Sequence, residues 1–92
     1  MSAASKRHME RVRRLPCIAT LMIEGQSVPS EELHHAESVR DELSDFLIIP
    51  LSWRYHSRNS PISIHALSRR GFERRYGISE LKMLAKVQEL LA

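Results

Sequence analysis

Residues 48–58, IIPLSWRYHSR, decide more of the predicted fold than any other stretch of the chain. The apolar run over residues 46–49 is typical of a short strand, and Pro50 fits a strand end or a sheet edge. The polar residues 53–58 then predict a short helix that carries His56. A strand, a turn and a helix in this order place His56 near the strand end, where other side chains can join it in a site.

The segments before residues 48–58, which we call the corner, predict a helix and a hairpin. Residues 3–14 predict a short basic helix with a thin apolar stripe. Residues 17–23 are apolar and partly β-branched, which favours a strand, and residues 24–27, EGQS, form a turn signal. Residues 32–37 are the second strand, which we expect to pair with the first as a hairpin. Residues 38–44 are acidic and predict either a loop or a single helical turn.

Two more helices are predicted after the corner. Ser68 is a good N-cap for a helix that runs to residue 76, and Gly77 is placed to end it. Ser79 is the expected N-cap of a final helix over residues 80–91, which is amphipathic. The residues of its expected apolar face are Leu81, Met83, Leu84, Val87, Leu90 and Leu91.

Length and composition indicate one small domain of the α+β class. The 92 residues, 42% of them hydrophobic, can bury one small core. We expect a short antiparallel hairpin or sheet packed with helices: a basic N-terminal helix or arm over residues 1–14, a core over 15–92 and a helical C-terminus. The single cysteine, Cys17, excludes an intramolecular disulfide and fits a reducing cytoplasm. The apolar runs are too short to cross a bilayer and no signal peptide is visible, so we expect no membrane partner.

The charges are strongly segregated along the chain. Residues 1–16 hold five basic side chains against one acid, residues 24–45 hold seven acids against one arginine, and residues 54–75 hold six arginines against one acid. Basic segments at both sides of an acidic one favour a polyanionic partner. The alternative is that the charged segments neutralise one another in the fold.

Arginines next to aromatic residues suit contacts with phosphates and nucleobases. We therefore predict a surface that binds nucleic acid or an acidic protein. The alternative is that Trp53 and Tyr55 are core anchors and that the arginines form a solvated face. The residues of the predicted surface are Arg11, Arg13, Arg14, Trp53, Arg54, Arg58, Arg69, Arg70, Arg74 and Arg75.

Histidines are the residues most able to hold a metal ion in this chain. His34 and His35 would face opposite sides of a strand, and His56 would come from the following helix. A strand histidine and a helix histidine can hold one divalent ion, and a further imidazole can act as a general base. The alternative is that these are half-buried histidines bonded to the backbone.

The order of several short motifs resembles the small phage HNH (ββα-metal) nucleases, in particular those similar to RecA-dependent phage nucleases. The resemblance covers residues 15–92 and implies an HNH-like fold. The matching motifs are LPCIAT at residues 15–20, ELHHAE at 32–37, IPLSWRYH at 49–56, SIHAL at 63–67 and GFERRYGISEL at 71–81.

The resemblance implies roles for particular histidines. His34 and His56 match the ligands of the catalytic metal, which would be Mg²⁺ or another divalent ion. His35 matches the base that activates water, and which of His34 and His35 takes which role stays open. His65 matches the histidine of the family's IH motif, to which we assign no role.

The chain also departs from the family pattern. The four positions that match the ligands of the family's structural zinc are Cys17, Thr20, Ser52 and Tyr55. Only Cys17 is a competent ligand, and a closed tetrahedral site needs four. We therefore expect no structural zinc and describe the resemblance as one to a degenerate HNH domain.

Loss of the zinc ligands leads us to predict a non-enzymatic function, with no catalytic residue and no cofactor. The chain is also similar to phage anti-CRISPR proteins that inhibit the type I-F (Csy) CRISPR-Cas surveillance complex. This similarity implies an inhibitor in the host bacterial cytoplasm that evades host defence. It would bind Cas subunits of the ribonucleoprotein complex and its crRNA, with DNA as a further candidate partner, and block recognition of target DNA. The alternative function is a metal-dependent HNH-type DNA endonuclease.

Overall fold

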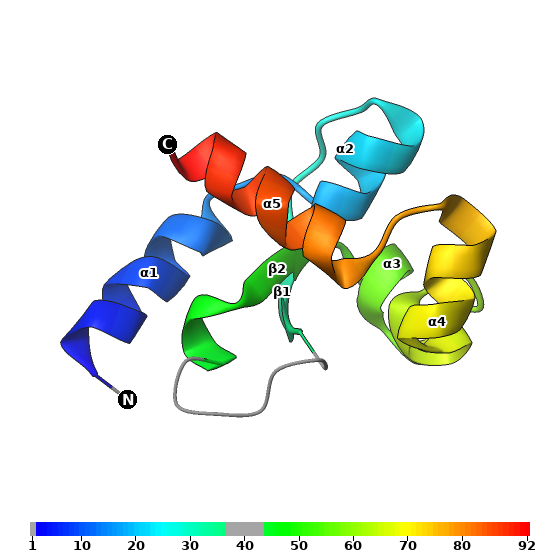
Figure 1. Ribbon diagram of the computed structural model, residues 1–92, viewed down its shortest axis with the longest axis horizontal. Coiled ribbons are helices and arrows are strands. Elements are labelled where there is room, and N and C mark those ends of the chain that lie inside the picture. Colours follow the sequence, from blue (N-terminus) through cyan, green and yellow to red (C-terminus); the bar gives the residue numbers. More distant parts are fainter. Residues whose placement is uncertain (1, 37–43) are drawn as a thin grey trace.

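Two short antiparallel strands lie at the centre of the computed structural model, which describes residues 2–36 and 44–92 (Figure 1). Strand β1 (Glu32–His35) pairs with β2 (Ile48–Leu51), so that His34 lies opposite Ile49 and Leu33 lies opposite Pro50. Within the described residues the sheet has these two strands alone. Both are therefore edge strands, where a proline that lacks an N–H is tolerated.

The predicted hairpin between residues 17–23 and 32–37 is wrong. Residues 18–24 form a helix, α2 (Ile18–Glu24), and β1 pairs with β2 instead. The Cys17 side chain caps the start of α2 by accepting from the N–H of Thr20, and Gly25 ends it at a φ of 69°. A short buried helix and a buried strand both give a continuous apolar run, so periodicity does not separate them.

The positions of the two strands were otherwise close to those predicted. The predicted strand at residues 46–49 lies two residues further on, because Ser44–Phe46 form a 3₁₀ turn, η1. The N–H of Ala36 donates to Leu47 at 3.0 Å and extends the pairing by one residue beyond β1. Two predicted segments extend outside the described residues. They are residue 37 of the predicted strand 32–37 and residues 38–43 of the predicted acidic loop or turn.

Helix α1 (Ala3–Arg13) and helix α5 (Glu80–Leu91) confirm two of the predicted helices. Ser2 and Ser79 cap their first turns with side-chain oxygens. The guanidinium of Arg11 donates to the carbonyl of Leu91 at 3.0 Å, so α1 lies against the end of α5. The apolar face of α5 was predicted in part: Met83, Leu84 and Val87 are buried, whereas Leu81 is 72% exposed and Leu90 is also exposed.

The remaining helices are α3 (Trp53–His56) and α4 (Ile64–Tyr76), which pack against each other beside the sheet, at the right of Figure 1. The predicted helix from Ser68 is the second part of α4. Ser68 does cap it, by accepting from the N–H of Gly71 at 3.2 Å, but a first turn that Ser63 caps precedes it. Gly77 ends α4 at a φ of 71°, as predicted.

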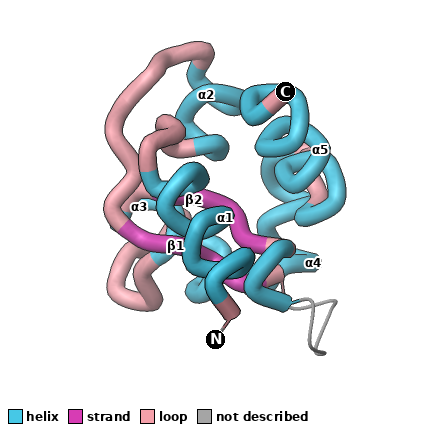
Figure 2. Tube along the Cα trace, turned by 90° about the vertical axis from the view of Figure 1, so that its left-hand side faces the viewer, coloured by secondary structure: helices cyan, strands magenta, loops and turns pink. Residues whose placement is uncertain are grey.

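The core lies between the sheet and three helices. Helices α1, α2 and α5 pack on β2, and α3 contacts both strands (Figures 1 and 2). The α+β class and the helical C-terminus are confirmed. None of the described helices is long and apolar enough to cross a membrane. The largest fully buried side chains include Val12, Ile18, Ile48, Ile49, Leu51, Ile64, Phe72, Met83 and Val87.

The kink in α4 stores backbone strain. Ser68 has φ 68° and ψ 163°, a conformation that is essentially restricted to glycine and costs other residues about 1–3 kcal/mol. We expect Ser68→Gly to raise the free energy of unfolding by about 1 kcal/mol, since glycine removes the strain and is a cap almost as good as serine. Urea denaturation measures this. Ser68→Ala, which keeps the strain and loses the cap, should be destabilised, and equal stability of the two variants would contradict the assignment of strain.

Candidate functional site

Three histidines from separate elements meet beside the sheet. His34 comes from β1, His56 from α3 and His65 from the first turn of α4. One ring nitrogen of each lies within 4.8 Å of the other two. The Nε2 atoms of His56 and His65 are 3.0 Å apart, and the three ring centroids are separated by 4.5 to 5.4 Å. We call His34, His56 and His65 the histidine cluster.

Local structure explains why each histidine points into the cluster. The alternation of β1 buries His34, which is 1% exposed, and turns His35 to solvent. The turn at Ser52 starts α3 directly after β2, so that His56 at the end of α3 lies next to β1. Ser63 caps the start of α4 and sets the position of His65 in its first turn.

Two carboxylates orient the rings of the cluster. Glu80 Oε2 lies 2.7 Å from His34 Nε2 in a fully buried pair, and Glu32 Oε1 lies 2.6 Å from His56 Nδ1. A carboxylate accepts the proton of the imidazole nitrogen that it faces, which leaves the other nitrogen of a neutral ring as a ligand atom. For His56 that atom is Nε2, which faces His65.

This set of donors fits a divalent transition-metal ion. Three imidazoles that each offer one nitrogen match the three protein ligands of a catalytic zinc site, which keeps a position open for water or substrate. Imidazole nitrogen also suits nickel and iron, whereas Mg²⁺ prefers oxygen. A carboxylate bonded to the outer nitrogen, as Glu32 is to Nδ1 of His56, is typical of a metal-ligating histidine.

The sequence identified part of this cluster. His34 and His56 were metal ligands only in the alternative nuclease interpretation, and the structure brings them together with His65, to which no role was assigned. Glu32 was missed, although it precedes His34 by two residues and therefore lies on the same face of the strand. Glu80 lies 46 residues from His34, and no local pattern connects the two.

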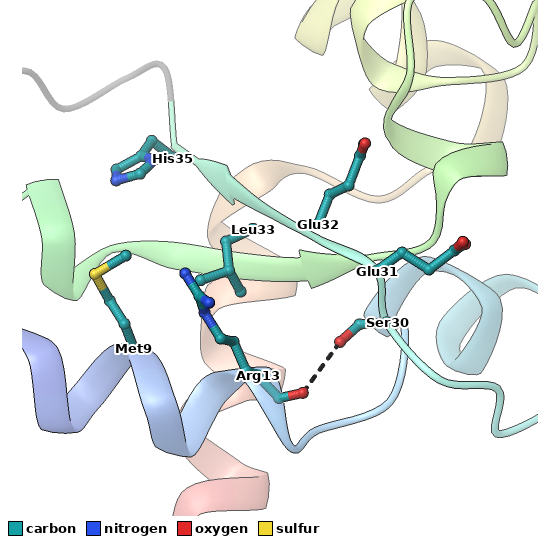
Figure 3. A pocket seen from close by; sticks show the side chains of 7 residues that line it. All are labelled: Met9, Arg13, Ser30, Glu31, Glu32, Leu33 and His35. Carbon is teal, nitrogen blue, oxygen red and sulfur yellow. Dashed lines mark hydrogen bonds between the residues drawn. The ribbon is translucent and has the colours of Figure 1, made fainter.

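His35 lines a cavity that no residue of the histidine cluster lines. Its ring points away from the buried side of β1, and its Nε2 lies 3.0 Å from Asp45 Oδ1. Figure 3 shows the His35 ring and the Arg13 side chain in one cavity of about 430 Å³ between α1 and β1. The role of base at the same metal as His34, which the resemblance implies for His35, therefore gains no support from the geometry.

The four positions that match the family's structural zinc ligands do not form a suitable donor set: Cys17 contacts Thr20 and Ser52, whereas the Tyr55 phenol bonds Glu24. The Cys17 thiol donates to Ser52 Oγ at 3.4 Å and accepts from the N–H of Thr20. Tyr55 packs edge-on against Phe72 and Tyr76. One thiol and three hydroxyl groups do not suit a closed zinc site, and the absence of a structural zinc stays a prediction.

Tyr55 is a core anchor, as the alternative interpretation of the aromatic residues held. Its phenol donates to Glu24, which also pairs with Arg54 at 3.3 Å. Burial, and then the bond to Glu24, raises the pKa of the Tyr55 phenol well above 10. Trp53, in contrast, is 48% exposed.

The raised pKa of Tyr55 predicts a loss of stability in alkali. Above pH 10 the phenol ionises in the unfolded chain before it ionises in the folded one, so the free energy of unfolding falls as pH rises. We expect the urea midpoint of the wild type to fall between pH 10 and 11, and that of Tyr55→Phe to fall less. Identical slopes in the two proteins would contradict this assignment.

The predicted arginine surface divides into two regions. Arg11, Arg13 and Arg14 lie in and directly after the last turn of α1, whereas the others lie on or beside α3 and α4, at the right of Figure 1. Among residues 2–36 and 44–92, no carboxylate pairs with an arginine of α4. These arginines, all exposed, are Arg69, Arg70, Arg74 and Arg75.

Comparisons with known proteins assign no family to the chain. No protein-family model matches it, and no curated protein matches it.

Proposed function

We propose that the protein is a metal-dependent phosphodiesterase that cleaves nucleic acid, with the histidine cluster as its active site. The observation that supports this proposal is the convergence of three imidazole nitrogens within 4.8 Å, two of them on rings oriented by carboxylates. Such a convergence is typical of metal-activated hydrolysis. The order of two antiparallel strands and a helix that carries His56 also agrees with the ββα arrangement that the resemblance to HNH nucleases implies.

The residues of the cluster have distinct tasks in this proposal. His34, His56 and His65 hold the ion, Glu32 fixes Nε2 of His56 as a ligand, and Glu80 holds the buried His34 ring. A divalent ion at such a site lowers the pKa of bound water and neutralises charge on a phosphate group. The exposed His65 leaves the cluster open to solvent on one side, so a polymer can reach it.

The proposal is tested by nicking of a supercoiled plasmid with Mg²⁺, Mn²⁺, Zn²⁺ or Ni²⁺. We expect the wild type to nick the plasmid with at least one of these ions, and chelation to stop it. His56→Ala should reduce the rate by about 100-fold or more, because it removes one of three ligands. His8→Ala is the control, since His8 lies on α1 and outside the cluster. No nicking with any ion, or equal rates in the two variants, would refute the proposal.

The inhibitor of the type I-F surveillance complex stays a prediction from the sequence. An inhibitor without chemistry would need no histidine cluster, and the arginines assigned to its surface divide between α1 and the region of α3 and α4. We therefore place it second. Binding to the purified surveillance complex at micromolar concentration, with no nicking of DNA, would reverse this order.

A further inference from the structure

A second cavity borders the histidine cluster. It has a volume of about 350 Å³ and lies between α4 and the start of α5. Its lining includes Glu80, whose carboxylate lies 2.7 Å from His34 Nε2. The cavity and the cluster thus share one side chain as a wall. The lining residues are Arg69, Arg70, Glu73, Ser79, Glu80 and Leu81.

Two arginines supply the positive charge of this cavity. Arg69 and Arg70 are exposed, and none of the described carboxylates pairs with either of them. They follow directly after Ser68, where the positive φ changes the direction of α4. A guanidinium that is not committed to a carboxylate can bind a phosphate group through two parallel hydrogen bonds.

Two acids face the same cavity and limit what it can bind. The Glu80 carboxylate is buried against His34, whereas Glu73 is exposed at the cavity and opposes a bound anion. Leu81, which is 72% exposed, adds an apolar surface at the edge. An apolar surface beside two arginines suits a ligand that carries both phosphate and a sugar or base, as a polynucleotide does.

We infer that Arg69 and Arg70 bind the polynucleotide backbone at a phosphate next to the one at the histidine cluster. The inference rests on the proposed function for the identity of the ligand. The cavity would hold the strand beside the metal site through Arg69 and Arg70, while Glu73 weakens the binding. The inference assigns this contact to Arg69 and Arg70 and not to the basic residues of α1.

The test measures binding of fluorescein-labelled oligonucleotides by anisotropy, with the wild type kept in chelator so that no cleavage occurs. The probes are single-stranded DNA, duplex DNA and single-stranded RNA of one sequence. The preferred probe is the one of the three that the wild type binds most tightly. We expect the double variant Arg69→Ala/Arg70→Ala to bind it about 10-fold or more weakly, and its affinity to depend less on salt concentration. Glu73→Gln should bind it more tightly than the wild type, because it removes the opposing charge.

The matched control is the double variant Lys6→Ala/Arg7→Ala, which removes the same charge from exposed positions on α1. We expect its affinity to stay within about twofold of the wild type. An equal loss in both double variants, or weaker binding by Glu73→Gln, would overturn the inference. If the wild type nicks plasmid and the Arg69→Ala/Arg70→Ala variant binds normally, the inference fails alone. If the arginine effect is found without any nicking, the proposed function fails alone.

Discussion

Glu80→Ala is expected to destabilise the protein by about 3–5 kcal/mol, the largest effect of any single substitution proposed for this chain. The substitution leaves the buried His34 ring without the carboxylate that lies 2.7 Å from its Nε2. Breaking a buried pair from one side costs this much because the remaining polar group stays desolvated. Since small domains have a free energy of unfolding of about 5–15 kcal/mol, the variant should be close to unfolding at 37 °C.

Urea denaturation at neutral pH measures this effect, and two variants control it. Glu80→Gln keeps an acceptor oxygen for His34. Its free energy of unfolding should fall by less than about half the loss expected for Glu80→Ala. Glu89→Ala lies on the exposed face of the same helix, where its pair with Lys86 contributes little, and should change stability by less than about 0.5 kcal/mol. Equal stability of Glu80→Ala and Glu89→Ala would contradict a structural role for the His34–Glu80 pair.

Zinc or nickel is expected to stabilise the wild type against heat by a large margin. An ion that binds the folded state at 100 times its Kd adds about 2.7 kcal/mol, which raises the Tm of a domain of this size by roughly 10–20 °C. His65→Ala should abolish most of this rise, because it removes one of the three nitrogens of the cluster. Glu32→Gln should weaken the affinity by about 10–100-fold, since it disturbs the orientation of His56.

The control for the thermal measurement is His35→Ala. His35 neighbours His34 in the chain but lines the cavity at α1, so its removal should leave the metal-induced rise in Tm unchanged. A rise that persists in His65→Ala and disappears in His35→Ala would place the ion elsewhere than in the histidine cluster.

Local signals predicted the elements that depend on caps and breakers. Ser79 and Gly77 start and end helices where the sequence indicated, because a side-chain oxygen at an N-cap and a positive φ at a C-cap are properties of single residues. The helix at Ile18–Glu24 was missed because its apolar residues fit a strand equally well. Its start depends on the Cys17 side chain, which is a weak acceptor and an uncommon cap.

The candidate site was predictable only where its residues lie near one another in the chain. The strand alternation separated His34 from His35 correctly, and the position of His56 after β2 followed from the corner at residues 48–58. His65 and Glu80 reach the cluster through the packing of α4 and the start of α5 against this corner. Such long-range contacts leave no periodic pattern in the sequence.

X-ray absorption of the zinc-loaded protein is the most direct test of the central claim that the three histidines hold a metal ion. We predict one zinc per chain with three imidazole nitrogens at about 2.0–2.1 Å and at least one further light ligand. The His56→Ala variant should lose this spectrum. A spectrum without histidine scattering, or one that stays the same in His56→Ala, would contradict the account.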